Sequence, residues 1–593
     1  MPVDAMSQSS ASSAAVSEGP PGAHALAMHG APALEEGFEH FPYVNPDAPQ
    51  GGRLTIGLTG GFDSLNPFIL RGRASRAIRS LVVESLMTRS QDEPFTLYGL
   101  LAERVETPED RTSVTFYLHP EARFSNGDQV TVEDVIWSME TLRAQGRPNH
   151  RSYYSQIVRT EPVGERGVRF VFEAPNRELP LLMGLMPVLS KADWAGRDFE
   201  TGGLRPILGS GPYKVAQVEA GRRILFEKSP DYWAADLPVN RGRHNFEQIE
   251  HLYFRTASAL WEGFTAGAVD LYSEYDPARW VEAYDVPAVQ DGSIERAAFE
   301  HGRPSGMDGF VFNTRRAKFQ DRRVRAALAL ALDYAWVNER FHRGGFARIE
   351  SYFSGSSLGF ENPAGPAENA LLAPFADDLP AGALEEAWRP PEGAGDGRNR
   401  RNMRAARRLL ADAGWTLQDG RLLDADGRAF AFEILLSTNQ PDRIAQVFVD
   451  AVAGLGIAAE IRQIDSAQYE ERLLNYDYDM ILRRWWLSLS PGEEQRFYWS
   501  ASAGAAPGSR NYMGVSDPAV DAMVDAMLAA RDREGFETAV RALDRVLSSG
   551  IYVIPLGYLE KDLLAWRRGV GVPKAAPLYG IDAVQDAYWR ASE

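Results

Sequence analysis

The sequence contains no cysteine among its 593 residues. Disulfides, thiolate metal sites and a cysteine nucleophile are therefore excluded. The lack of cysteine suits a protein that is exported to an oxidising compartment. A run of about 18 apolar residues, which a membrane-spanning helix needs, is also missing, so we expect no membrane span.

Basic residues are outnumbered by acidic residues. The formal net charge is −18, with 81 acidic against 63 basic residues. A nucleic-acid partner is not expected, because binding to phosphates needs a net basic face. The densest basic segment, RNRRNMRAARRLL from Arg398, has the spacing of an amphipathic helix with Ala405, Leu409 and Ala413 turned inward. We interpret its arginines as a solvated helix face.

Most motifs of enzymes and metal sites are also absent. The nine histidines are scattered, and none has the spacing of a His-x-x-x-His or His-Glu-x-x-His pair. GSSLG at residues 355–359 matches the nucleophile elbow of hydrolases, with Ser357 as the nucleophile. That elbow needs a strand before the serine and a helix after it, whereas this segment is rich in glycine and proline. A serine hydrolase is kept as an alternative, and no cofactor or metal is expected.

The length requires more than one hydrophobic core, since single cores stop growing well below 593 residues. IEHLYFRTASALWEGFTAGAVDLY, from Ile249, has the pattern of a strand, a helix and a further strand. The pattern restarts at residues 309–333, GFVFNTRRAKFQDRRVRAALALALD, where Asp321 is a good N-cap for a buried helix. Two α/β lobes are therefore predicted. Four residues are expected in the core of the second lobe: Phe310, Val324, Leu328 and Leu332.

The first 35 residues differ in amino-acid composition from the rest of the chain. They are rich in Ser, Ala, Gly and Pro, and they lack the basic start and apolar stretch of a secretory signal. We expect residues 1–35 to form a disordered or export-related tail.

The features most typical of ligand recognition follow the predicted strand DYDMILRRWW. Trp485 and Trp486 end this strand, and Glu493 and Glu494 follow shortly after. Only one of two adjacent tryptophans on a strand can face the core. Because ligands commonly bind at strand ends of open α/β sheets, we predict a ligand site here.

The chain resembles the periplasmic solute-binding proteins of the peptide/nickel ABC-importer family. Seven segments carry the resemblance in order: LLAERVE, FYLHPEARFSNGDQVTVEDVIWSME, LGSGPYKV, DYWAADLPVNRGRHNF, FTAGAVDLY, FNTRRAKFQDRRVRAALALALD and DYDMILRRWW. The likeness extends from about Phe38 to Trp589. HFPYVNPDAPQGG and LPVNRGRHNF resemble, more narrowly, the microcin C-type peptide-binding subgroup.

The resemblance implies the two-lobed α/β fold of periplasmic binding proteins, of the class with an extra subdomain in lobe one and a ligand cleft between the lobes. The implied limits are the tail at 1–35, lobe one at 36–272 with the extra subdomain at about 75–200, lobe two at 273–558, and a return to lobe one at 559–593. The chain is expected to cross between lobes near Tyr272–Tyr275 and again near Ile554–Trp566.

The resemblance also implies a function. A monomer in the periplasm would capture peptides or peptide conjugates and deliver them to the permease and ATPase subunits of an ABC importer. The residues implied at the ligand are Arg483, Trp485, Trp486, Ser488, Glu493, Glu494, Asn313 and Asn66. Many peptide binders of the family hold the peptide amine with an aspartate after the tryptophan, where this chain has LSLSP, so a free amine need not be the anchor. A sugar or opine ligand is an alternative within the same family.

Overall fold

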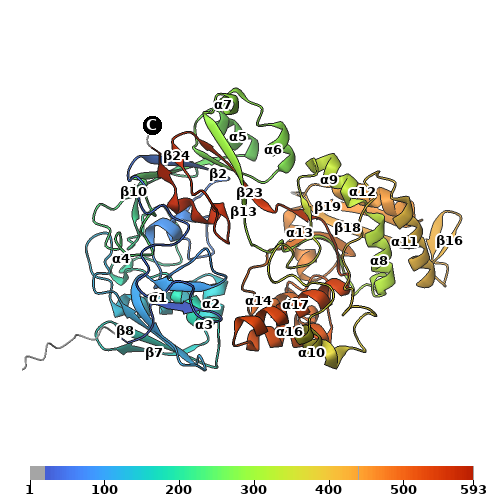
Figure 1. Cartoon of the computed structure of the whole chain (residues 1–593), viewed down its shortest axis with the longest axis horizontal. Coiled ribbons are helices and arrows are strands. Elements are labelled where there is room, and N and C mark those ends of the chain that lie inside the picture. Colours follow the sequence, from blue (N-terminus) through green and yellow to red (C-terminus); the bar gives the residue numbers. More distant parts are fainter. Residues whose placement is uncertain (1–20, 439, 592–593) are drawn as a thin grey trace, which may run out of the picture.

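The molecule has two lobes (Figure 1). The structure is a computed structural model and describes residues 21–438 and 440–591. Lobe one holds the first half of these residues together with the last strands of the chain, and lobe two holds the region between them. None of the helices within these two ranges combines the length and apolar character that a membrane crossing needs.

Lobe one is built on a seven-stranded mixed sheet in the order β13-β23-β12-β2-β11-β10-β9. The strands are β2 (Arg53–Thr59), β9 (Tyr213–Glu219), β10 (Arg223–Lys228), β11 (Gln248–Phe254), β12 (Leu271–Glu274), β13 (Ile294–Glu300) and β23 (Lys561–Arg567). β2 runs parallel to both β11 and β12. Helix α5 (Ala257–Thr265) connects β11 to β12. This connection is the strand–helix–strand unit that the sequence predicts.

Two smaller antiparallel sheets and a short ribbon, β24 (Val570–Gly571) with β25 (Trp589–Arg590), complete lobe one. One has the order β1-β4-β3, with β1 (Ala25–Ala27), β3 (Met87–Arg89) and β4 (Thr96–Gly99). The other has the order β5-β6-β8-β7, with β5 (Ala102–Glu106), β6 (Ser113–Leu118), β7 (Ile157–Val163) and β8 (Gly167–Phe172). Helices α1 (Val132–Gln145), α2 (Pro148–Tyr154) and α3 (Leu179–Gly184) pack beside them. One cluster of buried apolar side chains runs through all three sheets.

Part of the predicted N-terminal tail belongs to this lobe. Ala25, Leu26 and Ala27 are buried, and their strand β1 pairs with β4. The His29 ring stacks on Phe536 of lobe two, with 4.3 Å between ring centroids. Residues 21–35 are therefore not a disordered tail, because pairing and burial fix them in place. Residues 1–20 lie outside the described residues.

Lobe two is built on a five-stranded sheet in the order β19-β18-β20-β14-β21. The strands are β14 (Met307–Phe312), β18 (Ala431–Ser437), β19 (Ala458–Ile464), β20 (Met480–Trp485) and β21 (Val553–Pro555). Its main helices are α8 (Arg322–Ala331), α9 (Tyr334–His342), α11 (Arg400–Asp412), α12 (Arg443–Ala453), α13 (Ser466–Leu474), α14 (Glu494–Trp499), α16 (Pro518–Ala529) and α17 (Arg533–Ser549). Two short ribbons are added, β15 (Ala347–Arg348) with β22 (Gly557–Tyr558) and β16 (Thr416–Gln418) with β17 (Arg421–Leu423).

Both faces of this sheet are covered, because successive side chains of a strand point to opposite faces. Phe310 and Phe312 of β14 join one buried cluster with residues of α8 and α12. Met307 and Val311 of the same strand join another with residues of α16 and α17. A strand buried on both faces reads as a continuous apolar run, which explains the sequence of β14.

Helix α8 begins as its sequence predicts, since the Asp321 carboxylate accepts a hydrogen bond from the Arg323 N–H. The core prediction for lobe two is confirmed. Phe310 and Leu328 are 0% exposed, and Val324 and Leu332 are each 1% exposed.

The chain crosses from lobe one to lobe two later than the sequence predicts. After β12 it forms α6 (Pro277–Glu282) and α7 (Pro287–Gln290) and then β13, which is still in the sheet of lobe one. The register of β13 against β23 is unbroken from Ile294↔Arg567 to Glu300↔Lys561. The first crossing is therefore at 301–306, between β13 in lobe one and β14 in lobe two. The sequence pattern did not reveal this, because the strand that pairs with β13 lies far away in the sequence. The return crossing, at 559–560, falls between β22 and β23.

We expect Leu328→Ala to destabilise lobe two. The side chain is fully buried, so its truncation leaves a cavity and costs about 2–5 kcal/mol. Urea unfolding measures this loss, and the ligand affinity of the folded variant should not change. Leu417→Ala is the matched control, because Leu417 is 49% exposed in the same lobe. A weakened affinity without any loss of stability would place α8 at the ligand instead.

Candidate functional site

One edge of the lobe-two sheet faces the connections to lobe one. β18 and β20 are parallel, so their carboxyl ends lie at the same edge. β14 is antiparallel to β20 and starts at this edge, directly after the crossing at 301–306. β21 is antiparallel to β14 and ends there, shortly before the crossing at 559–560. A ligand held at this edge would lie between the lobes.

A cavity of about 640 Å³ lies at this edge. Its lining includes Asp308, Tyr334, His342, Phe346, Arg483, Arg484, Trp485, Trp486, Tyr498, Arg510, Tyr512 and Gly557. These residues come from the start of β14, both ends of α9 and the loop after it, the end of β20, helix α14 and the loop after it, and strand β22. Aromatic rings and arginines dominate the lining, which suits a ligand with apolar and anionic parts.

The two adjacent tryptophans take different roles, as the alternation of a strand requires. Trp485 is 3% exposed and packs against Trp499 and Tyr512, with ring centroids 5.3 and 5.5 Å away. Trp486 is 74% exposed, and the Arg484 guanidinium lies 3.8 Å from its ring centroid. Trp486 is therefore the tryptophan that presents a free aromatic face.

Positive charge gathers at this cavity, although the whole chain carries −18. Arg483 donates to the Tyr512 hydroxyl over 3.3 Å, and Arg510 donates to the Tyr498 hydroxyl over 3.3 Å. Asp308 is the one carboxylate in the lining, 3.6 Å from Arg484. Burial raises the pKa of Asp308 to about 6, although Arg484 acts in the opposite direction. The lining thus has more cations than anions.

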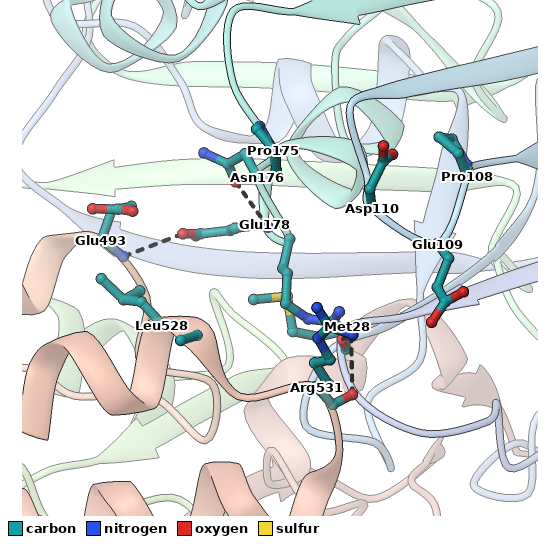
Figure 2. A pocket seen from close by; sticks show the side chains of 12 residues that line it. Met28, Pro108, Glu109, Asp110, Pro175, Asn176, Glu178, Glu493, Leu528 and Arg531 are labelled. Atoms are coloured by element: carbon teal, nitrogen blue, oxygen red, sulfur yellow. Dashed lines mark hydrogen bonds between the residues drawn. The ribbon is translucent and has the colours of Figure 1, made fainter.

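A second cavity, of about 650 Å³, lies where the two lobes touch (Figure 2). Lobe one contributes Met28, Glu109, Asp110, Arg177 and Glu178, and lobe two contributes Glu493, Leu528 and Arg531. The Glu493 N–H donates to the Glu178 carboxylate over 3.3 Å, and Arg177 donates to the Arg531 carbonyl over 3.1 Å. The described conformation is therefore one in which the lobes are in contact.

Two groups at this contact, Glu178 and His29, have strongly shifted pKa values. Burial raises the pKa of Glu178 to about 7, with further contributions from the negative charges of Glu494 and Glu493. His29, on the same side of the contact, has its pKa lowered to about 4 by burial and then by Arg177. His29 is consequently neutral near pH 7, while Glu178 is close to half protonated.

The structure brings only some of the predicted ligand residues together. Arg483, Trp485 and Trp486 line the cavity at the sheet edge, and Glu493 lines the cavity between the lobes. Glu494 lines neither cavity, and its carboxylate accepts from the Gly492 N–H over 3.0 Å. Ser488 also lines neither, and its hydroxyl accepts from the Ser490 N–H over 3.2 Å.

Asn313 and Asn66 are parts of the fold rather than of either cavity. Asn313 is 0% exposed and follows the far end of β14, where its amide donates to the Tyr476 and Tyr478 carbonyls. Asn66 is buried in lobe one and donates to the Phe199 carbonyl. Their amides are used to satisfy buried backbone groups, a role that the sequence pattern does not distinguish from ligand binding.

Sequence reasoning missed several lining residues. Asp308 and Tyr334 come from segments more than 140 residues before β20, and Arg510 comes from an irregular loop. No motif marks any of the three. Arg484 could have been found, because it lies between Arg483 and Trp485 on the strand that the sequence singled out.

The secondary structure around Ser357 does not fit the hydrolase alternative. Ser357 lies within turns, without the preceding strand and following helix of a nucleophile elbow. Within residues 21–438 and 440–591, no group of three or more histidine, aspartate or glutamate side chains is arranged to hold a metal ion.

Two lobes with a cavity at the edge that faces the crossings define a two-lobed solute-binding protein. The family model "Bacterial extracellular solute-binding proteins, family 5 Middle" matches residues 96–507. The peptidoglycan-binding protein YepA of Agrobacterium fabrum is 42% identical over 585 residues, which cover 96% of this chain and 95% of YepA. The chain belongs to family 5 of the bacterial extracellular solute-binding proteins. Proteins of this family bind solutes, pair with ABC permeases and are not enzymes.

Two solved structures share the fold. The oligopeptide-binding protein AppA from Bacillus subtilis, in complex with a nonapeptide, has a TM-score of 0.66 and 18% identity and covers 92% of this chain and 100% of its own. NikA from Brucella suis, in complex with Fe(III)-EDTA, has a TM-score of 0.70 and 20% identity and covers 91% of this chain and 100% of its own.

We expect Trp486→Ala to weaken ligand binding without a change in Tm, because the ring is exposed until a ligand covers it. Loss of a buried aromatic anchor costs roughly 2 kcal/mol or more. The Kd from calorimetric titration with a peptide ligand should therefore rise about 30-fold. Phe497→Ala is the matched control, since Phe497 is 46% exposed in the same lobe and lines neither cavity. Equal losses in both variants would argue against a contact at Trp486.

The contact between the lobes should depend on pH through Glu178. Its pKa is raised in the contact, so the contact is most stable below the ordinary carboxyl pKa and weakens as the pH rises through about 7. We expect the radius of gyration of the unliganded protein to increase as the pH rises from the ordinary carboxyl value of 4.5 to about 7, and to stay constant above that pH. Glu178→Gln should remove this dependence, and Glu109→Gln, on the same cavity, should retain it. A dependence that persists in Glu178→Gln would assign it to another group.

Proposed function

We propose that this protein captures peptides or peptide conjugates in the periplasm and delivers them to the permease of an ABC importer. The observation that carries the proposal is the cavity at the sheet edge, whose lining combines aromatic rings with three arginines. Aromatic walls accept varied side chains, and arginines pair with carboxylates through two parallel hydrogen bonds. Every peptide with a free C-terminus offers such a carboxylate.

The charge of the lining narrows the ligand class. The lining holds three arginines, Arg483, Arg484 and Arg510, and one carboxylate, Asp308, which lies beside Arg484. Arg483 also lies 3.9 Å from Glu470, which is outside the lining. A ligand with more than one carboxylate fits this excess of positive charge. The peptide part of peptidoglycan has that chemistry, and the relative YepA is named as a peptidoglycan-binding protein. Peptidoglycan-derived peptides are therefore the ligands that we favour.

Membership of the microcin C-type subgroup is also part of the proposal. The two segments that resemble it, 40–52 and 237–246, lie against each other in lobe one. The Gln50 amide donates to the Asn245 side chain over 2.6 Å, and the Gly51 N–H donates to the Asn245 carbonyl over 2.7 Å. These segments support a shared architecture, and they do not line the cavity at the sheet edge.

Ligand binding would act through the two crossings. A ligand held in lobe two gives lobe one a surface to close on, so binding shifts the open–closed equilibrium by the difference in affinity between the two states. The closed form would be the one that the permease recognises. The protein acts as a monomer in this scheme.

A metal chelate is the second candidate. NikA, which shares the fold, binds Fe(III)-EDTA, a ligand with several carboxylates that could also pair with the arginines. A sugar or opine has fewer charges to match this lining and is less well supported.

Native mass spectrometry of the freshly purified protein tests the proposal. We expect a retained mass that is released on denaturation and fragments as a peptide with two or more carboxylates. Protein denatured before desalting is the control for molecules that merely co-purify. A retained metal chelate or sugar, with no peptide, would refute the peptide assignment.

A further inference from the structure

Arg348 lies beside the cavity at the sheet edge, close to the return crossing. It ends β15, and its register partner on β22 is Gly557. β22 is followed at once by the crossing at 559–560. Arg348 is therefore placed between the cavity and the connection about which the lobes would move.

The Arg348 guanidinium has no partner among the described residues. Its Nε, Nη1 and Nη2 atoms are closed off from solvent and make no hydrogen bond there. The residue as a whole is half-buried, so only its other atoms are accessible. Tyr334 is its neighbour, with 4.2 Å between the guanidinium carbon and the ring centroid. Burial lowers the pKa of Arg348 to about 10.

Other buried arginines of lobe two are fully satisfied. Arg325 donates to the carbonyls of Phe319, Gln320, Gly550 and Ile551. Arg545 pairs with Glu368 and donates to several carbonyls. A buried charge without a partner is costly, and in this respect Arg348 differs from both Arg325 and Arg545.

The cavity and Arg348 share their neighbours. Tyr334, Phe346 and Gly557 all line the cavity. Phe346 directly precedes β15, which Arg348 ends. A Cβ at Gly557 would meet the Tyr334 hydroxyl at 1.9 Å, so the Tyr334 ring fills the space between Gly557 and Arg348. The Tyr334 ring thus lines the cavity and also lies against the Arg348 guanidinium, which does not line it.

We propose that Arg348 binds a carboxylate of the ligand, which reaches the guanidinium when the Tyr334 ring swings aside. This inference rests on the proposed function, because it takes the ligand to be a peptide. It adds a second contact for the ligand, next to the crossing at 559–560. A ligand in the cavity would then also touch the segment that connects the two lobes. In the unliganded protein, Asp308 is not the carboxylate partner of Arg348, because Asp308 pairs with Arg484.

Three peptides serve as probes: Ala-Glu-Lys, its C-terminal amide, and Ala-Gln-Lys. We expect Arg348→Gln to raise the Kd about 30-fold for the peptides that carry the contacted carboxylate, as loss of hydrogen bonds to a charged group does. The probe that lacks this carboxylate should bind the wild type and the variant equally. If that probe is the C-terminal amide, Arg348 contacts the C-terminal carboxylate, and if it is Ala-Gln-Lys, Arg348 contacts the glutamate side chain. Arg348→Lys keeps the charge without the paired donors and should lose less than Arg348→Gln.

Thermal unfolding without ligand separates this role from a structural one. Arg348→Gln and Arg348→Met should have a Tm equal to or above that of the wild type, because both remove an unpaired buried charge. Arg325→Gln, which removes satisfied hydrogen bonds in the same lobe, should lower the Tm. A drop for Arg348→Gln as large as that for Arg325→Gln would overturn the inference.

The binding results also separate two kinds of failure. If the wild type binds the probes and Arg348→Gln binds all three with unchanged Kd, the anchor at Arg348 is refuted and the peptide function stands. If the wild type binds none of the three probes, the peptide function fails and the anchor fails with it.

Discussion

Pairing of β23 with β12 and β13 is the constraint on which the two-lobed arrangement depends. β13 matches β23 over its whole length, and β12 covers its other side from Leu271↔Trp566 to Glu274↔Leu563. A few residues earlier, β21 is still paired with β14 in lobe two. The chain must therefore cross between the sheets immediately before β23. Because both crossings leave the same edge of the lobe-two sheet, that edge is the one that lobe one can cover.

The same edge concentrates charge of the sign that the whole molecule lacks. A net charge of −18 repels anions at long range, but this field is screened over about 8–10 Å in physiological salt. Inside the cavity, Arg483, Arg484 and Arg510 act over shorter distances than this screening length. Binding of the anionic ligand that we propose would therefore depend on where lobe two places its arginines, and not on the sign of the net charge.

Contact between the lobes uses different chemistry. His29 stacks on Phe536, Arg177 donates to the Arg531 carbonyl, and Glu178 accepts from the Glu493 N–H. Each of these contacts is weak alone, and the Glu178 carboxyl is unfavourable there when ionised. An interface of this kind can open and close, because it does not fix the lobes by a large apolar surface.

The sequence alone determined the local structure and the family. Asp321, the helix after it and the buried face of Leu328 follow from hydrogen-bonding capacity and periodicity, and strand alternation required that one of Trp485 and Trp486 be buried. Tertiary structure decided the rest. The partner of β13, the burial of residues 25–27, the position of Asn313 at the far end of β14 and the meeting of Asp308 with Arg484 all depend on pairing between distant segments. Periodicity reports which face of an element is buried, but it carries no information about which distant segment covers that face.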